Sequence, residues 1–335
     1  MSNDMNGTIP KIDFAGIDPA AASPGDGDSR WATVRAAVMD ALMEHGGFEA
    51  VMDDLVAPEL RAAMLATGGA AESLFSLPPT TKARYTNEKP YLGYVSSSIP
   101  GMPYETFSVM DPLSPDVVPT LAGLMWPDTG GDSSFCETMH AYTERVAVLE
   151  AMVRRMVLES VGVNAEHIEE QAKTTSLRLR ISRYPAPGGA GAEGRVGLPA
   201  HRDTSFLSVL TQNDVDGLEV ECGRGDGGWA RPALSPCSFL ILAGDMLKVL
   251  TNGRVYSPLH RVVIAGDKTR YSCILFSNPK DDAVVRAVDG AVDAQHPAVY
   301  KAFGYAEYIA FCFTREQYRN PNKVEAFAAV AGVEG

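Results

Sequence analysis

Alternation of apolar and polar positions dominates the middle of the chain. From Ser176, Leu177, Leu179 and Ile181 alternate with polar residues until Pro185, which is the pattern of a half-buried strand. Further strands are predicted at residues 205–211, 217–222, 238–243, 246–250, 255–256, 259–264 and 270–277. Asn252-Gly253 has the composition of a two-residue hairpin turn. Short strands in close succession predict a β-barrel core.

Apolar positions at helical spacing lie on both sides of this core. An edge strand at residues 9–14, a helix at 31–45, a strand from Phe48 and a helix at 58–75 are predicted at the N-terminal side. Ser134 and Glu137 form a capping box that predicts a long helix to about Ser160. Its buried stripe should consist of Tyr142, Val146, Leu149, Val153, Met156 and Val157. Residues 91–107 should be irregular and partly extended.

Composition and charge exclude several classes of partner. The 335 residues carry 29 basic and 42 acidic side chains, a net charge of −13, which argues against nucleic acid and against an anionic membrane surface. No apolar run approaches the roughly 20 residues of a membrane span. The five cysteines are scattered and odd in number, which is typical of reduced thiols. We therefore expect a cytoplasmic, monomeric protein that binds a small molecule.

Candidate metal ligands lie in the barrel region. His201 and Asp203 are two residues apart, so on one strand both side chains would leave the same face. His260 follows 57 residues after Asp203 (260 − 203), far enough for several strands to run out and return. Two histidines and one carboxylate bind one face of a non-haem Fe(II) and leave positions open for other ligands.

A candidate carboxylate site follows the second histidine. Arg270 lies ten residues after His260, and Ser272 should share its strand face. The arginine fork can hold a carboxylate with two parallel hydrogen bonds, and the serine hydroxyl is a further donor. Iron together with a dicarboxylic co-substrate is the chemistry that this pattern indicates.

The ordered set H-x-D, H and R-x-S resembles the plant 2-oxoglutarate/Fe(II)-dependent dioxygenases of the isopenicillin N synthase-like superfamily. Residues 125–128 and 276–280 look like the branch that contains the glucosinolate side-chain dioxygenases. The resemblance implies an α+β, mainly β fold: a double-stranded β-helix (jelly-roll, cupin-like) barrel with flanking helices. It divides one structural unit into a supporting N-terminal region (1–120), a catalytic core (121–290) and a C-terminal helical lid (291–335).

The resemblance also implies cofactors and their ligands. Fe(II) would be held by His201, Asp203 and His260, with 2-oxoglutarate and O2 as co-substrates and ascorbate in support. The family carries Asn-x-Tyr near the end of the strand before the metal motif. Tyr184 matches its tyrosine, which binds the co-substrate carboxylate with Arg270 and Ser272, whereas Ser182 stands at the asparagine position. Arg202, between the two metal ligands, is expected to form an ion pair on the outer face.

The implied reaction is hydroxylation, desaturation or ring closure of a small, largely apolar plant metabolite or hormone, with release of succinate and CO2. Candidate pocket residues are Phe276, Leu207, Tyr94, Phe107, Phe311 and Arg180. An acidic substrate would need a further cation, for which Arg178 and Arg180 lie on the strand face of Tyr184. Two alternatives use the same residues: an Fe(II) oxidase of this fold that does not use 2-oxoglutarate, and a non-catalytic metal-binding cupin-like protein.

Overall fold

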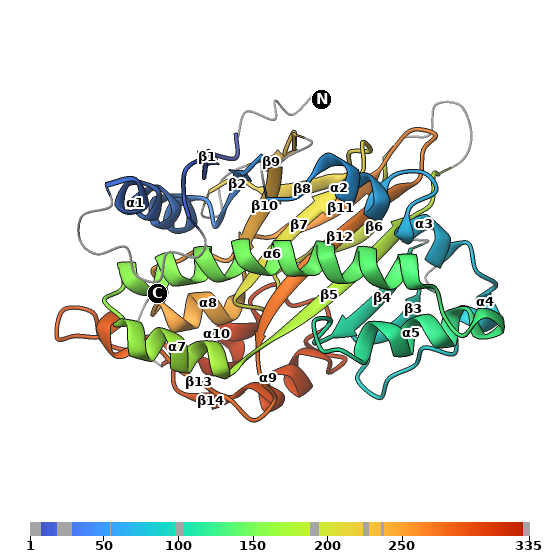
Figure 1. The fold of residues 1–335 in the computed structure, drawn as a ribbon. Helices are drawn as coiled ribbons and strands as arrows, with labels where there is room; N and C mark the ends of the chain where they lie inside the picture. The colour runs from blue at the N-terminus through green and yellow to red at the C-terminus, as the bar shows by residue number, and fades with distance from the viewer. Residues whose placement is uncertain are drawn as a thin grey trace.

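The computed structural model describes residues 8–18, 29–53, 55–97, 104–187, 194–223, 228–235 and 238–330. A large and a small β-sheet form its centre (Figure 1). The large sheet contains, in spatial order, β1 (Lys11–Asp13), β2 (Gly47–Val51), β10 (Ser238–Ala243), β7 (Leu207–Gln212), β12 (Arg270–Pro279), β5 (Thr175–Tyr184), β4 (Glu105–Met110) and β3 (Gly93–Ser96). The small sheet contains β6 (Arg195–His201), β11 (His260–Ile264), β8 (Leu218–Glu221) and β9 (Trp229–Ala230). A short ribbon pairs β13 (Val284–Val285) with β14 (Phe303–Gly304).

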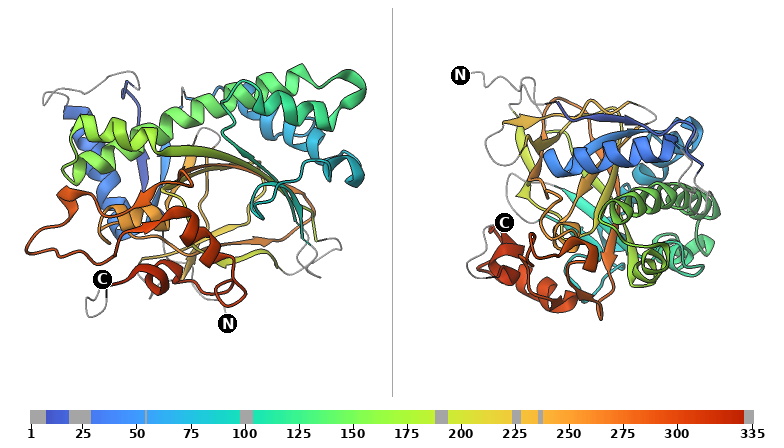
Figure 2. Two further views of the ribbon diagram at one scale, coloured as in Figure 1. Left: turned by 90° about the horizontal axis from the view of Figure 1, so that it is seen from below. Right: turned by 90° about the vertical axis from the view of Figure 1, so that its left-hand side faces the viewer.

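Helices flank the sheets. They are α1 (Ser29–Glu44), α2 (Pro58–Leu65), α3 (Ala70–Phe75), α4 (Pro79–Lys82), α5 (Val117–Met125), α6 (Ser133–Ser160), α7 (Ala165–Lys173), α8 (Asp245–Leu250), α9 (Tyr305–Cys312) and α10 (Lys323–Ala328). The long helix α6 runs along one side of the large sheet, and the C-terminal segment with α9 and α10 lies on another side (Figures 1 and 2). The predicted stripe of α6 is buried, with every member at most 1% exposed. The predicted helix and its stripe are therefore confirmed.

The two faces of the large sheet have different neighbours. Leu179 and Ile181 of β5, Val209 of β7 and Leu275 of β12 join the main core with the helices. Tyr184, Leu210, Leu240 and Leu242 join a second core instead, together with Leu218, Val220, Val262 and Ile264 of the small sheet. The second core thus lies between the two sheets. We call the face of the large sheet that points toward it the interior face.

Several predicted elements are confirmed and others are wrong. The strand at 238–243 is found with the expected bounds, and β1 is an edge strand. Residues 246–250 form the helix α8 instead of a strand. Asn252 and Gly253 do adopt positive φ angles of 54° and 80°, but they end α8 instead of forming a hairpin, since the Gly253 N–H donates to the Lys248 carbonyl at 2.8 Å. Residues 255–256 form no strand.

Two predicted helix boundaries also need correction. The helix expected at 58–75 is broken into α2 and α3 at Gly68-Gly69, where Gly68 has a φ of 80°. The N-cap of α6 is Asp132, whose carboxylate accepts from the Phe135 N–H at 3.0 Å, and not Ser134. Residues 91–107 contribute more regular structure than expected, since β3 and the start of β4 lie there.

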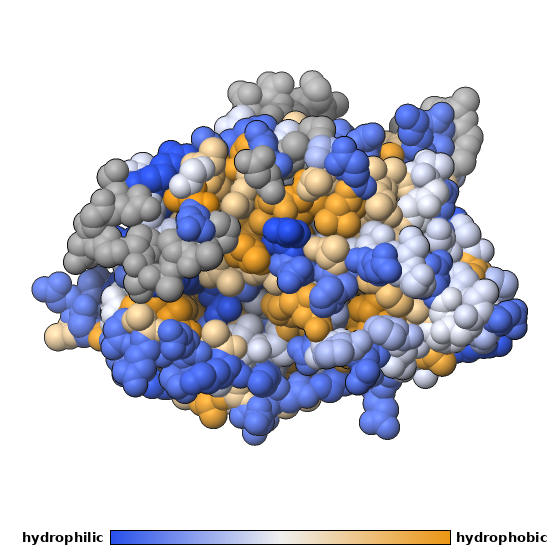
Figure 3. All heavy atoms as spheres, in the orientation of Figure 1, coloured by the Kyte–Doolittle hydropathy of each residue, from blue (hydrophilic) through white to orange (hydrophobic). Residues whose placement is uncertain are grey.

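The surface is mixed in character. The view in Figure 3 shows hydrophilic residues around most of the outline, with apolar residues between them. Within the described part of the chain, no helix has both the length and the hydropathy needed to cross a membrane.

Candidate active site

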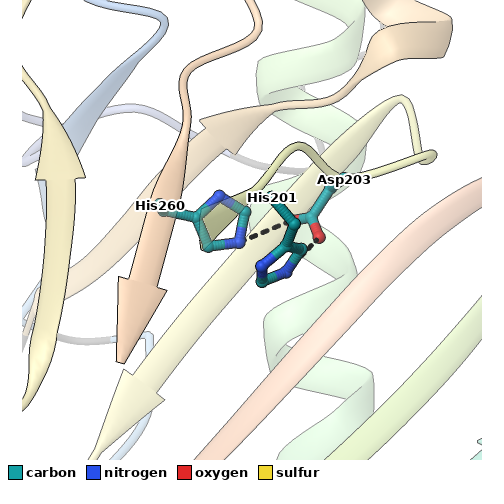
Figure 4. A group of neighbouring side chains, drawn as sticks. All are labelled: His201, Asp203 and His260. Atoms are coloured by element: carbon teal, nitrogen blue, oxygen red, sulfur yellow. Dashed lines mark ion pairs between the residues drawn. The ribbon is translucent and has the colours of Figure 1, made fainter. Parts of the chain in front are cut away.

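His201, Asp203 and His260 converge at the edge of the small sheet (Figure 4). His201 ends β6 and His260 begins β11, and the two lie opposite each other in the antiparallel pair. Asp203 Oδ1 lies 3.7 Å from His201 Nε2, and Asp203 Oδ2 lies 3.6 Å from His260 Nε2. One ligand atom from each residue lies within 4.8 Å of the others. The three side chains can therefore reach one metal ion.

Asp203 reaches this position by a different route from the expected one. β6 ends at His201, so the two ligands do not share a strand. Asp203 lies in the following loop, where its carbonyl accepts from the Asp245 N–H at the start of α8, at 2.8 Å. The strand-face argument was wrong, although the convergence of the side chains was predicted.

Each histidine presents its Nε2 atom to the site. Nδ1 of His201 lies 2.8 Å from the Pro199 carbonyl, and Nδ1 of His260 lies 3.5 Å from the Pro258 carbonyl. A carbonyl can only accept, so Nδ1 carries the proton and Nε2 keeps its lone pair. Burial, and then the neighbouring His260, lower the pKa of His201 to about 3. The His201 side chain is therefore uncharged at neutral pH, and its Nε2 lone pair is available to a metal ion.

Ser208 orients the carboxylate. Its hydroxyl donates to Asp203 Oδ2 at 2.6 Å. Burial raises the pKa of Asp203, but the two histidines and this hydroxyl outweigh it and hold the pKa below its ordinary value. Sequence reasoning missed Ser208. The available signal was a polar residue at an inward position of an otherwise apolar strand.

Arg270 is a buried guanidinium that lacks an anionic partner among the described residues. Its side chain is fully buried, and Nε and Nη2 donate to Gln212 Oε1 at 3.2 and 2.8 Å. Nη1 is buried and has no hydrogen-bond partner in the described part of the chain. Burial lowers the pKa of Arg270, which reflects the cost of this charge. A carboxylate ligand would satisfy the free N–H groups and compensate the charge.

The other predicted carboxylate ligands lie beside Arg270. Tyr184 pairs with Arg270 across β5 and β12, and the guanidinium lies 5.3 Å from the centre of its ring. Ser272 is buried, two residues further along the same face, opposite Ser182 on β5 and Gln212 on β7. The residues present therefore fit one end of a dicarboxylate. Gln212 was not predicted, because a glutamine at the end of a strand carries no distinguishing pattern.

The strand register separates the six pocket candidates. Phe276 and Arg180 lie on the interior face with Arg270, as expected from their even spacing. Leu207 pairs with Ser277 and lies on the opposite face, in the helix-packed core. Tyr94 and Phe107 pair with each other, and Phe107 pairs with Ile181, so both also face the helices.

Leu207, Tyr94 and Phe107 were thus wrong as pocket residues. For Leu207, the bends at residues 204–206 reset the alternation that had been counted from His201. For the two aromatics, only the pairing of distant strands defines the face. Phe311 lies on α9 and packs against Phe327, with ring centres 5.0 Å apart and the ring planes tilted by 45°.

Helix α9 contacts the loop that carries Asp203. The Tyr305 hydroxyl donates to Asn278 Oδ1 at 3.3 Å and lies 3.5 Å from the Thr204 carbonyl. The Tyr308 hydroxyl donates to Asp245 at 2.8 Å. Arg202 points elsewhere: it forms an ion pair with Glu221 at 3.8 Å, as expected for this residue.

Comparison with known proteins identifies the family. The profile described as the 2OG-Fe(II) oxygenase superfamily matches residues 176–279, from β5 to β12. The chain is 36% identical over 324 residues to the probable 2-oxoglutarate-dependent dioxygenase AOP1.2 of Arabidopsis thaliana, covering 96% of each chain. It belongs to the 2-oxoglutarate/Fe(II)-dependent oxygenases.

Solved structures agree with this assignment. The dioxygenase for auxin oxidation from rice superposes with a TM-score of 0.74 at 28% identity, covering 96% of this chain and all of that one. JOX2, solved in complex with 2OG, Fe and JA, superposes with a TM-score of 0.75 at 25% identity, covering 96% and 89%. The resemblance predicted from the sequence is confirmed. This oxygenase is an enzyme that depends on Fe(II) and 2-oxoglutarate.

Proposed function

We propose that this oxygenase hydroxylates, desaturates or cyclises a small, largely apolar plant metabolite or hormone, with release of succinate and CO2. His201, Asp203 and His260 hold Fe(II), and Arg270, Ser272 and Tyr184 hold the far carboxylate of 2-oxoglutarate. The strongest support is Arg270, a fully buried cation whose Nη1 has no partner among the described residues. A non-catalytic metal-binding protein would have no use for such a group.

The protein's part in the reaction is placement and exclusion of water. When bound, iron with 2-oxoglutarate and O2 supplies the oxidising power for attack on a C–H bond. Gln212 holds the Arg270 fork by two hydrogen bonds, which fixes the direction of the bound dicarboxylate. Ser208 orients Asp203 in the same way. Phe276, buried on the interior face, and Tyr305, whose hydroxyl bonds to Asn278 and lies 3.5 Å from the Thr204 carbonyl of the ligand loop, restrict water near the reacting atoms.

The organisation of the chain is part of the proposal. The two facing sheets would form a double-stranded β-helix, with residues 121–290 as its catalytic core. Residues 1–120 would support this core, and residues 291–335 would act as a lid through the contacts of α9. We propose a cytoplasmic monomer, in which the four described cysteines are free thiols.

The proposed substrate range draws support from relatives whose names concern plant hormones. The rice neighbour is a dioxygenase for auxin oxidation, and the JOX2 structure contains JA. Apolar groups of the interior face, such as the buried Phe276 and the partly buried Ile274, suit the apolar body of a small hormone-like molecule.

Succinate release from 2-oxoglutarate tests this function. Purified protein is incubated with Fe(II), ascorbate and air, alone and with pools of indole acids, gibberellins, flavonoids and thioethers. We expect one pool to raise the release several-fold above the background without substrate. Consumption of O2 without succinate would instead identify an oxidase that does not use 2-oxoglutarate. Neither O2 consumption nor succinate with iron bound would identify a binding protein.

A further inference from the structure

A second buried guanidinium lies on the interior face, away from Arg270. Arg178 of β5 pairs with Phe276 of β12, and Phe276 pairs with Ser208 of β7. These three residues form one row across the sheet, and Ser208 donates to the metal ligand Asp203. Two strand spacings of about 4.8 Å separate Arg178 from Ser208 at the backbone. The long arginine side chain lies over the intervening Phe276 ring, with 4.2 Å between guanidinium and ring centre.

Arg178 lacks the partners that a buried arginine usually has. It is 9% exposed, and its hydrogen bond among the described residues is a long one of 3.4 Å from Nη1 to the Tyr91 carbonyl. No carboxylate of the described chain lies within ion-pair distance of it, unlike the buried Arg154, which pairs with Glu150 at 2.9 Å. Burial, and then the neighbouring Arg180, lower the pKa of Arg178 to about 10, so it stays charged at neutral pH.

Arg180 adds to this unbalanced positive charge. It lies two residues from Arg178 on the same face, and its Nε is buried without a partner among the described residues. Two like charges so close on one strand are mutually unfavourable. The charge of Arg270 would be compensated by 2-oxoglutarate, but the same ligand would leave Arg178 and Arg180 in excess. Asp203 attracts Arg178, but it is a metal ligand, so compensation of the remaining charge would require an anionic group on the substrate.

Arg178 is too far from Arg270 to hold the same carboxylate. Its partner Phe276 lies six residues from Arg270 along β12 (276 − 270), which corresponds to about 20 Å of strand. The two guanidiniums thus mark opposite ends of the interior face. Aromatic rings surround the Arg178 end: Phe276 beneath it and Tyr91 at 5.5 Å.

We propose that Arg178, assisted by Arg180, binds the carboxylate of the oxidised substrate, which is therefore a small organic acid with an apolar body against Phe276 and Tyr91. This inference rests on the proposed function, because it places the acid beside iron and 2-oxoglutarate. The anchored carboxylate sets which C–H bond of the acid is presented to the metal. Arg178 is thus a specificity-determining residue.

The test compares acids with neutral analogues of the same shape. Binding of indole-3-acetic acid and indole-3-acetamide, phenylacetic acid and phenylacetamide, and jasmonic acid and methyl jasmonate is measured by calorimetry. The protein carries Fe(II) and 2-oxoglutarate, and O2 is excluded. For at least one pair we expect the wild type to bind the acid tenfold or more tightly than its neutral analogue, because the analogue cannot form charge-assisted hydrogen bonds with Arg178.

Variants assign that preference to Arg178. Arg178→Gln should reduce the acid's affinity by roughly 10- to 100-fold and make the acid and its analogue bind about equally, and Arg178→Lys should recover part of the preference. Arg183→Gln is the matched control, because Arg183 lies on the same strand but on the opposite face, paired with Glu105 at 2.7 Å. It should keep the wild-type preference.

The outcomes separate this inference from the proposed function. The affinity for 2-oxoglutarate, measured in the same way, should be unchanged in Arg178→Gln. If that affinity falls together with acid binding, Arg178 serves the co-substrate and the inference is overturned. It is also overturned if no acid binds better than its analogue, or if Arg178→Gln keeps the preference. If the wild-type protein with Fe(II) does not bind 2-oxoglutarate at all, the proposed function is rejected instead.

Discussion

Replacement of Arg270 by leucine should weaken the binding of 2-oxoglutarate and leave the stability of the fold nearly unchanged. The residue is fully buried, forms no ion pair with a described residue and donates two hydrogen bonds to the neutral Gln212. Its removal therefore leaves no opposite charge unpaired in the protein. The variant loses the fork for the carboxylate of 2-oxoglutarate but keeps the iron ligands. We expect a large defect in co-substrate use and a small change in folding.

The magnitude follows from the hydrogen bonds that the fork would form. Two charge-assisted bonds contribute about 1.5 kcal/mol each at the lower limit, so their loss costs at least about 3 kcal/mol. Since about 1.4 kcal/mol corresponds to a factor of ten, KM for 2-oxoglutarate should rise more than roughly a hundredfold. Removal of an uncompensated buried charge should raise the free energy of unfolding, whereas the Gln212 oxygen left without its donor should lower it by about 1–3 kcal/mol. The two effects should nearly cancel.

The assay is the initial rate of succinate release over a range of 2-oxoglutarate concentrations, with urea denaturation of the apoprotein alongside. Arg270→Lys should be intermediate, since it keeps the charge without the fork. Arg183→Gln, on the opposite face of the neighbouring strand, should leave KM at the wild-type value. An unchanged KM in Arg270→Leu would refute the assignment. A loss of several kcal/mol of stability would refute the view that the cation is uncompensated.

Three further predictions concern other parts of the molecule. Asp203→Ala should lose stoichiometric iron in a metal assay while its unfolding transition stays near that of the wild type; an iron content of one per chain would contradict the ligand set. Ser208→Ala should weaken iron affinity by about tenfold or more because the 2.6 Å bond to Asp203 is lost, whereas Ser205→Ala, which removes a hydroxyl 3.1 Å from that of Ser208, should have a smaller effect; an iron affinity of Ser208→Ala equal to that of the wild type would exclude the orienting role. Glu105→Gln should lower the free energy of unfolding by about 3 kcal/mol at pH 7, since the buried Lys82 loses its carboxylate partner at 2.5 Å. Burial raises the pKa of Glu105, but Lys82 and its other partners hold it below the ordinary value of 4.5; the ion pair therefore contributes fully above pH 4.5, and the difference from wild type should shrink as pH falls below it. Urea denaturation at pH 7 and pH 4 measures this, and a difference that grows in acid would contradict it.

Candidate site residues could be predicted from the sequence because metal and carboxylate binding depend on the type of side chain and on the order of those side chains along the chain. The metal ligands His201, Asp203 and His260 are confirmed as a cluster, and the assignment of Arg270, Ser272 and Tyr184 to 2-oxoglutarate stays a prediction. Period-two alternation also placed Phe276 and Arg180 correctly, since within one strand the face follows from counting. The long helix α6 followed from its apolar stripe in the same local way.

The wrong predictions concern segments whose structure depends on contacts with distant parts of the chain. Residues 246–250 were predicted as a strand because a short apolar run does not distinguish a strand from a helix by its period. In the structure they form the helix α8, whose first residue, Asp245, bonds to the loop that carries Asp203. Counting also failed across the turn between His201 and Leu207. Tyr94 and Phe107 are aromatic residues near the site in sequence, but their pairing with each other and with β5 turns them toward the helices.

By itself, the sequence determined the metal-ligand set and the family, because each depends on side-chain type in a fixed order; the co-substrate clamp of Arg270, Ser272 and Tyr184 stays a prediction. Only the tertiary structure decided which side chains face one another. Strand pairing placed Gln212 against Arg270 and Arg178 in the row of Phe276. These contacts join residues that are distant along the chain, so no local periodicity encodes them. The proposed substrate end of the site depends on such contacts, and only the folded chain shows that Arg178 has no carboxylate within ion-pair distance among the described residues.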